Sequence, residues 1–269
     1  MEQAVSNYLI RESWEHFTQQ EHNLWTYLYD RQLTIFPKCV AKENLEGLEK
    51  LHIRRDRIPQ FSEVTGRLKG LTGWDVVAVP GLVPDEIFFK LLSEKKFPST
   101  CFIRTPDKVD YLQEPDIFHD MFGHIPLLAH KTFADYMEAF AHIALNCLKR
   151  NELKRASRLY WFTIEFGLIQ TAEGLRTYGS GIVSSYKETL YCVESPTPLR
   201  IPFSMERIMR TNYRIDDIQE NYFVIKSFDD LFQSTLTDPN ILIDKVASMA
   251  DIEPGTLFEG EVNLPANTV

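Results

Sequence analysis

The sequence predicts a mainly α-helical fold with a few short β-strands in a single domain. Most segments repeat apolar residues at intervals of three or four, which is the helical period. Only three short runs have the β-branched or aromatic character of strands. The chain has 269 residues, 44% of them apolar, and no internal repeat or low-complexity linker divides it.

In the first half of the chain, short helices alternate with extended pieces. Residues 1–20 are polar, and we expect them to be loose. Gly73 and Pro80-Gly81 bound a β-branched run, which indicates a strand between them. We expect helices over residues 18–35, 41–52, 61–71 and 88–92, and extended segments over residues 74–79 and 100–104.

The second half is expected to hold the longest helices. Thr132 and Asp135 resemble a capping box before a helix that contains Met137 and Leu148. Residues 152–175 are predicted to form one long helix, residues 222–225 a strand and residues 229–236 a late helix. The domain is expected to span residues 21–250. The tail, residues 251–269, contains proline and glycine and has no heptad repeat.

Charge and cysteine usage exclude several classes of protein. The net charge is -9, and the longest basic stretch is the short run at residues 54–57, so we expect no nucleic acid and no anionic membrane as partner. The four cysteines are widely spaced and are expected to be reduced thiols. With no apolar signal segment and no run long enough to span a bilayer, the expected location is the cytoplasm.

Two histidines and one glutamate suggest a metal site. Residues 115–126 contain His119 and His124, and Glu165 lies in the apolar run of residues 159–168. Two imidazoles and one carboxylate hold iron(II) by one face in mononuclear oxygenases and leave the other face open. In a regular helix, side chains five residues apart point about 140° away from each other. Gly123 and Pro126 are therefore expected to end or distort the helix between the ligands.

The surroundings of Glu165 also favour a metal. Apolar residues occupy several faces of its predicted helix, and residues 159–170 contain no lysine or arginine. A buried carboxylate needs a cation or a metal. The ordinary alternative is that the histidines are satisfied core residues, as we expect for His16, His22, His52, His130 and His142, which are predicted to lie on the surface or in packing. A zinc hydrolase and a helical interaction module with a structural metal are two further alternatives.

The motif Pro-Asp-Ile-x-His-x-x-x-Gly-His-x-Pro, followed by Leu-Tyr-Trp-Phe-Thr-x-Glu-Phe-Gly-Leu, resembles the pterin-dependent aromatic amino acid hydroxylases, most closely their bacterial phenylalanine-hydroxylating members. The resemblance covers about residues 20–235 and includes the run Tyr178-Gly179-Ser180-Gly181. It implies a single, mostly helical aromatic amino acid hydroxylase catalytic domain. It also implies Fe(II), held by His119, His124 and Glu165, and a reduced pterin such as tetrahydrobiopterin that supplies two electrons.

The resemblance assigns further residues to the cofactor and the substrate. The pterin is expected to lie against the backbone of residues 81–83 and the ring of an aromatic residue, with an acidic group nearby: Gly81, Leu82, Val83, Phe88 and Asp120. Asp120 stands where animal relatives carry glutamate. The substrate carboxylate is expected to meet a guanidinium held by a carboxylate, and other residues complete the amino-acid pocket: Arg104, Asp116, Trp161, Gly181, Ser184 and Ser185. Leu112 replaces a threonine of the animal relatives.

Two positions bear on the choice of substrate. Tryptophan-hydroxylating relatives carry phenylalanine where this chain has Trp161, and tyrosine-hydroxylating relatives carry aspartate where it has Ile215. The expected substrates are therefore L-phenylalanine, dioxygen and the pterin, with L-tyrosine as product. Tryptophan hydroxylation is the alternative within the family, and simple core packing is the alternative role of both residues. Without a heptad tail, we expect a monomer or a dimer.

Overall fold

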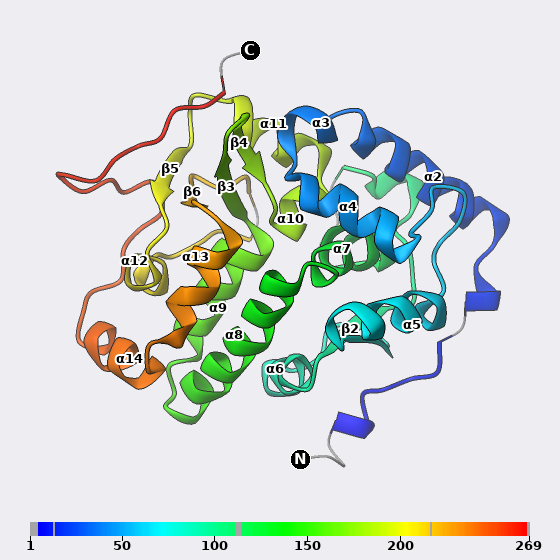
Figure 1. The fold of residues 1–269 in the computed structure, drawn as a ribbon, viewed down its shortest axis with the longest axis horizontal. Helices are drawn as coiled ribbons and strands as arrows, with labels where there is room; N and C mark the ends of the chain where they lie inside the picture. The colour runs from blue at the N-terminus through cyan, green and yellow to red at the C-terminus, as the bar shows by residue number, and fades with distance from the viewer. Residues whose placement is uncertain (1–4, 13, 111–113, 216, 268–269) are drawn as a thin grey trace.

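Helix α8, Lys131–Lys149, runs through the middle of the molecule (Figure 1). It packs against α6, Asp85–Ser93, against α9, Leu153–Tyr160, and against α13, Phe228–Gln233. The computed structural model describes residues 5–12, 14–110, 114–215 and 217–267. Within these ranges most regular elements are helices, as the sequence predicts.

The amino-terminal helices form where the apolar periodicity places them. Thr18 caps α2 and forms a capping box with Glu21, while Gly73 ends α5 in a left-handed conformation. These helices are α2, Gln19–Leu33; α3, Phe36–Cys39; α4, Lys42–Leu51; and α5, Phe61–Thr72. The predicted helices over residues 18–35, 41–52 and 61–71 are confirmed. Helix α6 extends the one predicted over residues 88–92 by about a turn at its start.

A small parallel sheet joins β1, Asp75–Val79, to β2, Lys96–Thr100, with α6 as the crossover between them. The strand expected over residues 74–79 is confirmed. The extended segment expected over residues 100–104 is wrong, because the register with β1 pairs Asp75 with Lys96 and ends at Thr100. Residues 101–104 lie outside the sheet, and the backbone carbonyl of Phe102 accepts a hydrogen bond from the backbone N–H of Ile117 at 2.8 Å.

A second sheet has the strand order β4-β3-β6-β5. Strand β3 is antiparallel to β4 and parallel to β6, and β5 is parallel to β6. The strands are β3, Gly167–Thr171; β4, Gly174–Thr177; β5, Leu199–Pro202; and β6, Asn221–Ile225. Only β6 was predicted. It is buried along its whole length, which makes it readable as an apolar run.

The single long helix predicted for residues 152–175 is wrong. Helix α9 ends at Tyr160, a π-helical turn follows, and the chain then enters β3 and β4. Tyr178 packs so closely against the α-carbon of Gly167 that a β-carbon there would lie 2.2 Å from the ring. Apolar residues at mixed spacings suit a helix or a buried strand equally, and here the pairing with β6 decides.

The capping box predicted at Thr132 is wrong as well. Helix α8 begins at Lys131, and the imidazole of His130 caps it by accepting a hydrogen bond from the backbone N–H of Phe133 at 3.4 Å. The remaining short elements are η1, Trp14–His16; η2, Pro106–Lys108; α7, Ile125–Leu128; α10, Ser180–Val183; α11, Tyr186–Glu194; α12, Met205–Arg210; η5, Ser234–Leu236; and α14, Pro239–Ala247.

Within the described residues, the chain after α14 forms no further helix or strand and runs past α12 and β5 (Figure 1). Ile252 forms a bridge with Thr211, and the backbone N–H of Leu264 donates to the carbonyl of Arg200 at 2.8 Å. Asp251 pairs with the buried guanidinium of Arg158 at 2.8 Å. None of the helices within the described ranges is both long and apolar enough to cross a membrane.

Candidate metal centre

All three candidate metal ligands lie in π-helical turns. His119 and His124 begin and end η3, His119–His124, and Glu165 ends η4, Trp161–Glu165. Each turn closes with a hydrogen bond between residues five apart: Ile125 N–H donates to the Asp120 carbonyl, and Phe166 N–H donates to the Trp161 carbonyl. This pattern places side chains five residues apart on nearly the same face. The predicted distortion between the histidines is therefore confirmed, as a π-turn that continues into α7.

Aromatic packing holds the first turn in place. The rings of Phe118 and Phe122 stack with centroids 4.7 Å apart and are fully buried. Trp25 and Tyr29 of α2 contact them edge-on at 5.3 Å and 5.1 Å. On the other side, Gly123 lets α10 approach so closely that a β-carbon would lie 2.8 Å from the Ser180 carbonyl. The apolar side of the turn faces the core, and its histidines face Glu165.

The three ligand atoms meet at distances that fit one metal ion. Nε2 of His119 and Nε2 of His124 are 3.0 Å apart, and Nε2 of His124 is 2.9 Å from Oε1 of Glu165. Nε2 of His119 is 3.7 Å from Oε2 of Glu165. Donor atoms about 2.1 Å from a metal and at right angles to each other lie about 3 Å apart. The donor set and its geometry therefore fit a metal held by one face, the arrangement typical of iron(II) oxygenases.

The imidazoles of His119 and His124 favour the charged form of the Glu165 carboxylate, and this carboxylate in turn favours the charged form of His119. Burial alone would raise the pKa of Glu165, but the two adjacent imidazoles hold that pKa well below its usual range. Burial would lower the pKa of His119, and the Glu165 carboxylate outweighs it and raises the pKa above its ordinary value. The carboxylate is thus ionised at neutral pH, the form that binds a cation.

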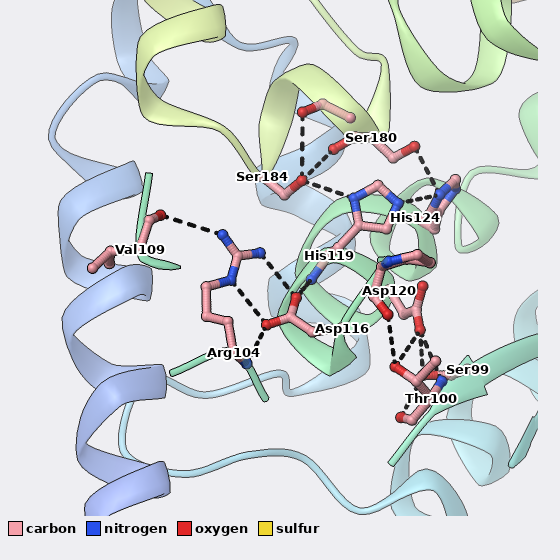
Figure 2. Close-up of polar contacts among 12 residues, drawn as sticks. Ser99, Thr100, Arg104, Val109, Asp116, His119, Asp120, His124, Ser180 and Ser184 are labelled. Atoms are coloured by element: carbon pink, nitrogen blue, oxygen red, sulfur yellow. Dashed lines mark hydrogen bonds and ion pairs between the residues drawn. The ribbon is translucent and has the colours of Figure 1, made fainter. Parts of the chain in front are cut away.

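Ser184 and Ser180 orient the histidines from above, as Figure 2 shows. The hydroxyl of Ser184 donates to the Ser180 carbonyl at 2.8 Å, so its oxygen accepts from Nδ1–H of His119 at 3.0 Å. This fixes the tautomer that leaves Nε2 free to bind a metal. The hydroxyl of Ser180 lies 3.0 Å from Nε2 of His124 and 3.3 Å from Oε2 of Glu165. Ser184 therefore contacts one of the candidate metal ligands, His119. Its neighbour Ser185 instead caps the start of α11.

Arg104 and Asp116 form a buried pair beside His119 (Figure 2). Nε and one Nη of Arg104 each donate to a different oxygen of Asp116 at 2.9 Å, and the second Nη donates to the Val109 carbonyl at 3.3 Å. Asp116 also accepts from the backbone N–H of His119 at 3.0 Å. These contacts use three of the five guanidinium N–H donors, so two remain for another group.

Asp120 points away from the ligand atoms and toward the end of β2 (Figure 2). Its Oδ2 accepts hydrogen bonds from Ser99, from the Thr100 backbone and from the Thr100 hydroxyl, at 3.1, 2.9 and 3.2 Å. Burial raises the pKa of Asp120. The carboxylate thus ties the first π-turn to the small sheet.

The expected pterin segment lies at the surface after β1. Leu82 is 70% exposed, and the space over the α-carbon of Gly81 is open. Among the described residues, no hydrogen bond engages the backbone of residues 81–83, so this edge is free to pair with an amide-like ring edge. Phe88 contacts Tyr160 edge-on at 5.4 Å, and Tyr160 lies 6.2 Å from the His124 ring.

Trp161 and Gly181 border Glu165. The indole of Trp161 stacks on Phe166 at 4.6 Å and on Tyr213 at 4.3 Å. Ile215 is 73% exposed, so core packing, one role left open for it, is excluded. Leu112 lies outside the described residues.

Sequence reasoning missed Ser180 as a ligand contact, and it missed Phe97 and Tyr160, whose rings flank His124 at 4.8 Å and 6.2 Å. Ser180 lies in the Gly179–Gly181 run, which is part of the motif of the resemblance, but its residue type alone does not indicate contact with a ligand. Among the other histidines, His22 accepts a hydrogen bond from the backbone of Ile58 and His142 is exposed, in line with the surface or packing roles expected for them.

The amino-acid sequence is similar to a known protein family and to several of its bacterial members. The family model of the biopterin-dependent aromatic amino acid hydroxylases matches residues 11–244. The phenylalanine-4-hydroxylase of Caulobacter vibrioides is 47% identical over 98% of this chain and 90% of its own length. That of Ralstonia nicotianae is 46% identical over 100% of this chain and 83% of its own length.

Solved structures agree with the sequence relatives. The crystal structure of phenylalanine hydroxylase from Chromobacterium violaceum bound to cobalt superimposes with a TM-score of 0.93 at 42% identity, covering 96% of this chain and 93% of that chain. A structure of the same enzyme with bound oxidised Fe(III) gives a TM-score of 0.93 at 43% identity, covering 96% and 94% of the two chains.

Proposed function

The chain belongs to the biopterin-dependent aromatic amino acid hydroxylases and is an iron- and pterin-dependent phenylalanine 4-monooxygenase, and from this premise we propose which residues carry the reaction. The substrates are L-phenylalanine, dioxygen and a tetrahydropterin, and the product is L-tyrosine. Family membership sets aside the zinc hydrolase and the non-enzymatic module. The meeting of His119, His124 and Glu165, whose ligand atoms all lie within 4.8 Å of one another, is the observation that carries the proposal.

His119, His124 and Glu165 hold the iron. When bound, iron(II) and the reduced pterin activate dioxygen and supply the electrons for hydroxylation. The side chains of His119 and Glu165 keep exposed fractions of 16% and 12%, so the ligand atoms are not sealed within the core. Phe97 and Tyr160 cover His124 with their rings, which limits water on that side.

Arg104 anchors the substrate carboxylate through its two remaining N–H donors. Asp116 fixes the guanidinium plane and, through the backbone of His119, fixes the distance between this anchor and the metal. A planar fork held in this way suits bidentate recognition of a carboxylate. Gly181 and Ser184 border the same space, and their main roles are to leave room for Glu165 and to orient His119. We also propose that Trp161 forms a wall for the substrate ring.

The pterin lies along residues 81–83 with Phe88 beside it. The exposed, unengaged backbone there supports this placement, as does the chain of rings from Phe88 through Tyr160 to His124. Asp120 is tied to Ser99 and Thr100, so any pterin contact uses its second oxygen. We further propose a catalytic domain over residues 21–250, a monomer or dimer in the reducing cytoplasm, and no nucleic-acid or membrane partner.

The direct test is a competition assay. Purified enzyme loaded with iron(II) receives tetrahydrobiopterin, dioxygen and equal concentrations of isotope-labelled phenylalanine, unlabelled tryptophan and unlabelled tyrosine. Chromatography separates the products, and the label distinguishes newly formed tyrosine from the tyrosine that was added. A zinc-loaded sample is the control. We expect tyrosine formed from phenylalanine to dominate, with no product in the zinc sample. Dominance of 5-hydroxytryptophan or dihydroxyphenylalanine would show that the substrate assignment is wrong while the iron and pterin roles stand.

A further inference from the structure

The indole of Trp161 is held on both faces and at one edge. Phe166 and Tyr213 stack on its two faces with interplanar angles of 25° and 14°. Stacking of this kind fixes the plane of a ring but leaves it able to turn and slide within that plane. The edge contact removes this freedom, because Nε1–H of Trp161 donates to Oε1 of Gln219 at 3.0 Å.

Gln219 is itself tightly held. It is 3% exposed, and its side-chain amide donates to the backbone carbonyls of Arg214 and Asp217 at 2.8 Å and 3.2 Å. Those two bonds orient the amide so that its oxygen faces the indole. Gln219 thus connects the segment after α12 to the π-turn that carries Glu165.

Glu188 anchors the backbone of this connection. It lies in the first turn of α11, directly after the run that contains Gly181 and Ser184. Its Oε1 accepts a hydrogen bond from the backbone N–H of Gln219 at 3.4 Å and a short one from the hydroxyl of Tyr222 on β6. A chain of hydrogen bonds therefore runs from β6 through Glu188 and Gln219 to Trp161, entirely among buried or half-buried groups.

We propose that Gln219, anchored by Glu188, is a positioning residue that fixes the in-plane orientation of Trp161 and so sets the preference for phenylalanine over tryptophan. The inference rests on the role proposed above for Trp161 as a wall of the ring pocket. Trp161 and Glu165 begin and end the same π-turn. A turned indole would change the space for the substrate ring, while the histidine ligands, which lie in the other turn, stay in place.

The test compares Gln219→Leu with Gln170→Leu, the same chemical change at an exposed residue of β3. Because a neutral hydrogen bond contributes about 1 kcal/mol, we expect Gln219→Leu to raise the KM for phenylalanine about fivefold and to shift the product ratio toward hydroxytryptophan. Bound iron and the KM for the pterin are expected to stay unchanged. Gln170→Leu should change none of these. Calorimetric titration with L-phenylalanine gives a second measure of affinity that is independent of turnover.

The effect must pass through the indole N–H, so the same change is repeated in a Trp161→Phe protein, which lacks that donor. There Gln219→Leu is expected to have no further effect on the product ratio. An equal shift in both backgrounds, or no shift in either, would overturn the inference. If Trp161→Phe alone leaves the product ratio unchanged, the role proposed for Trp161 as a wall of the ring pocket fails. This outcome differs from failure of the Gln219 inference, in which Trp161→Phe shifts the ratio but Gln219→Leu does not act through the indole. Gln219→Asn, one methylene shorter, gives the same test with less risk to folding.

Discussion

The α-carbon of Gly181 faces the carboxylate of Glu165 so closely that a methyl group built on it would lie 2.9 Å from Oε2 and 3.2 Å from the Glu165 carbonyl oxygen. The backbone conformation of Gly181 does not require glycine, because the residue lies inside helix α10, Ser180–Val183, and its φ is not positive. The glycine is therefore required by the space that the Glu165 carboxylate occupies.

This relationship predicts the outcome of Gly181→Ala. The added methyl group is expected to displace Glu165 and to weaken iron binding by about tenfold or more, because the ligand geometry of a metal site tolerates only small shifts. Metal content after dialysis against increasing chelator measures the effect. Gly70→Ala is the control, since the space over Gly70 in α5 is open. Equal iron retention in both variants would contradict the prediction.

The metal site itself predicts that His124→Ala loses most bound iron and nearly all activity. One of three ligands would be missing, and Glu165 would lose the imidazole nearest to it at 2.9 Å. The matched control is His142→Ala, which removes an exposed imidazole from α8. Iron content by atomic absorption and tyrosine formation are measured together. Normal turnover by iron-free His124→Ala protein would refute the ligand assignment.

Arg104→Ala is expected to weaken L-phenylalanine binding much more than pterin binding. Loss of a charge-assisted hydrogen bond costs about 1.5–3 kcal/mol, roughly ten- to a hundredfold in affinity. The same variant leaves Asp116 fully buried without its partner, which costs about 3–5 kcal/mol of unfolding free energy.

Arg104→Lys keeps the positive charge but not the two-pronged guanidinium, so it separates the effect on binding from the effect on stability. Calorimetric titration with phenylalanine and with pterin measures affinity, and urea unfolding measures stability. Unchanged phenylalanine affinity in folded Arg104→Lys protein would show that the fork is not the anchor.

The contact between Asp251 and Arg158 predicts a pH dependence of stability. Hydrogen bonds from Arg158 hold the pKa of Asp251 well below its usual value, although partial burial opposes them. A lowered pKa in the folded state adds stability above the ordinary aspartate pKa of about 3.9, and this stability is lost as the pH falls through the lower folded value.

Asp251→Asn is therefore expected to lower the unfolding free energy at pH 7 and to make less difference near pH 3. The effect should be modest, since the side chain of Asp251 is 33% exposed and solvent screens it. Urea unfolding at both pH values checks this, with the exposed Asp56→Asn as control. A loss of stability equal at pH 7 and pH 3 would show that the ion pair is not its source.

The candidate metal ligands could be picked out because their residue types and order suit the chemistry, and the structure brings the three side chains together. The resemblance leads us to expect Arg104 and Asp116 side by side, and the structure brings the two together. What sequence could not give is the π-turn. A spacing of five between His119 and His124 is incompatible with a regular helix, and the residues alone do not say whether the helix ends or widens.

Other misses have a common physical origin in long-range pairing. Residues 152–175 were predicted as one helix because Leu159, Phe162 and Phe166 suit a helical face. The strand that replaces its second half exists because Gly167 pairs with Phe223, 56 positions later. The bond between Gln219 and Trp161 spans a separation of 58. Local periodicity carries no information about such partners.

The first π-turn compensates for its own extra residue. Five residues, from His119 to His124, cover about the arc that four residues cover in an α-helix. With one residue fewer the histidines would stand four apart, a spacing at which an ordinary helix also pairs them. The width of the turn therefore keeps His119 and His124 paired at a spacing of five, and the segment before them, which carries Asp116, keeps its place beside His119.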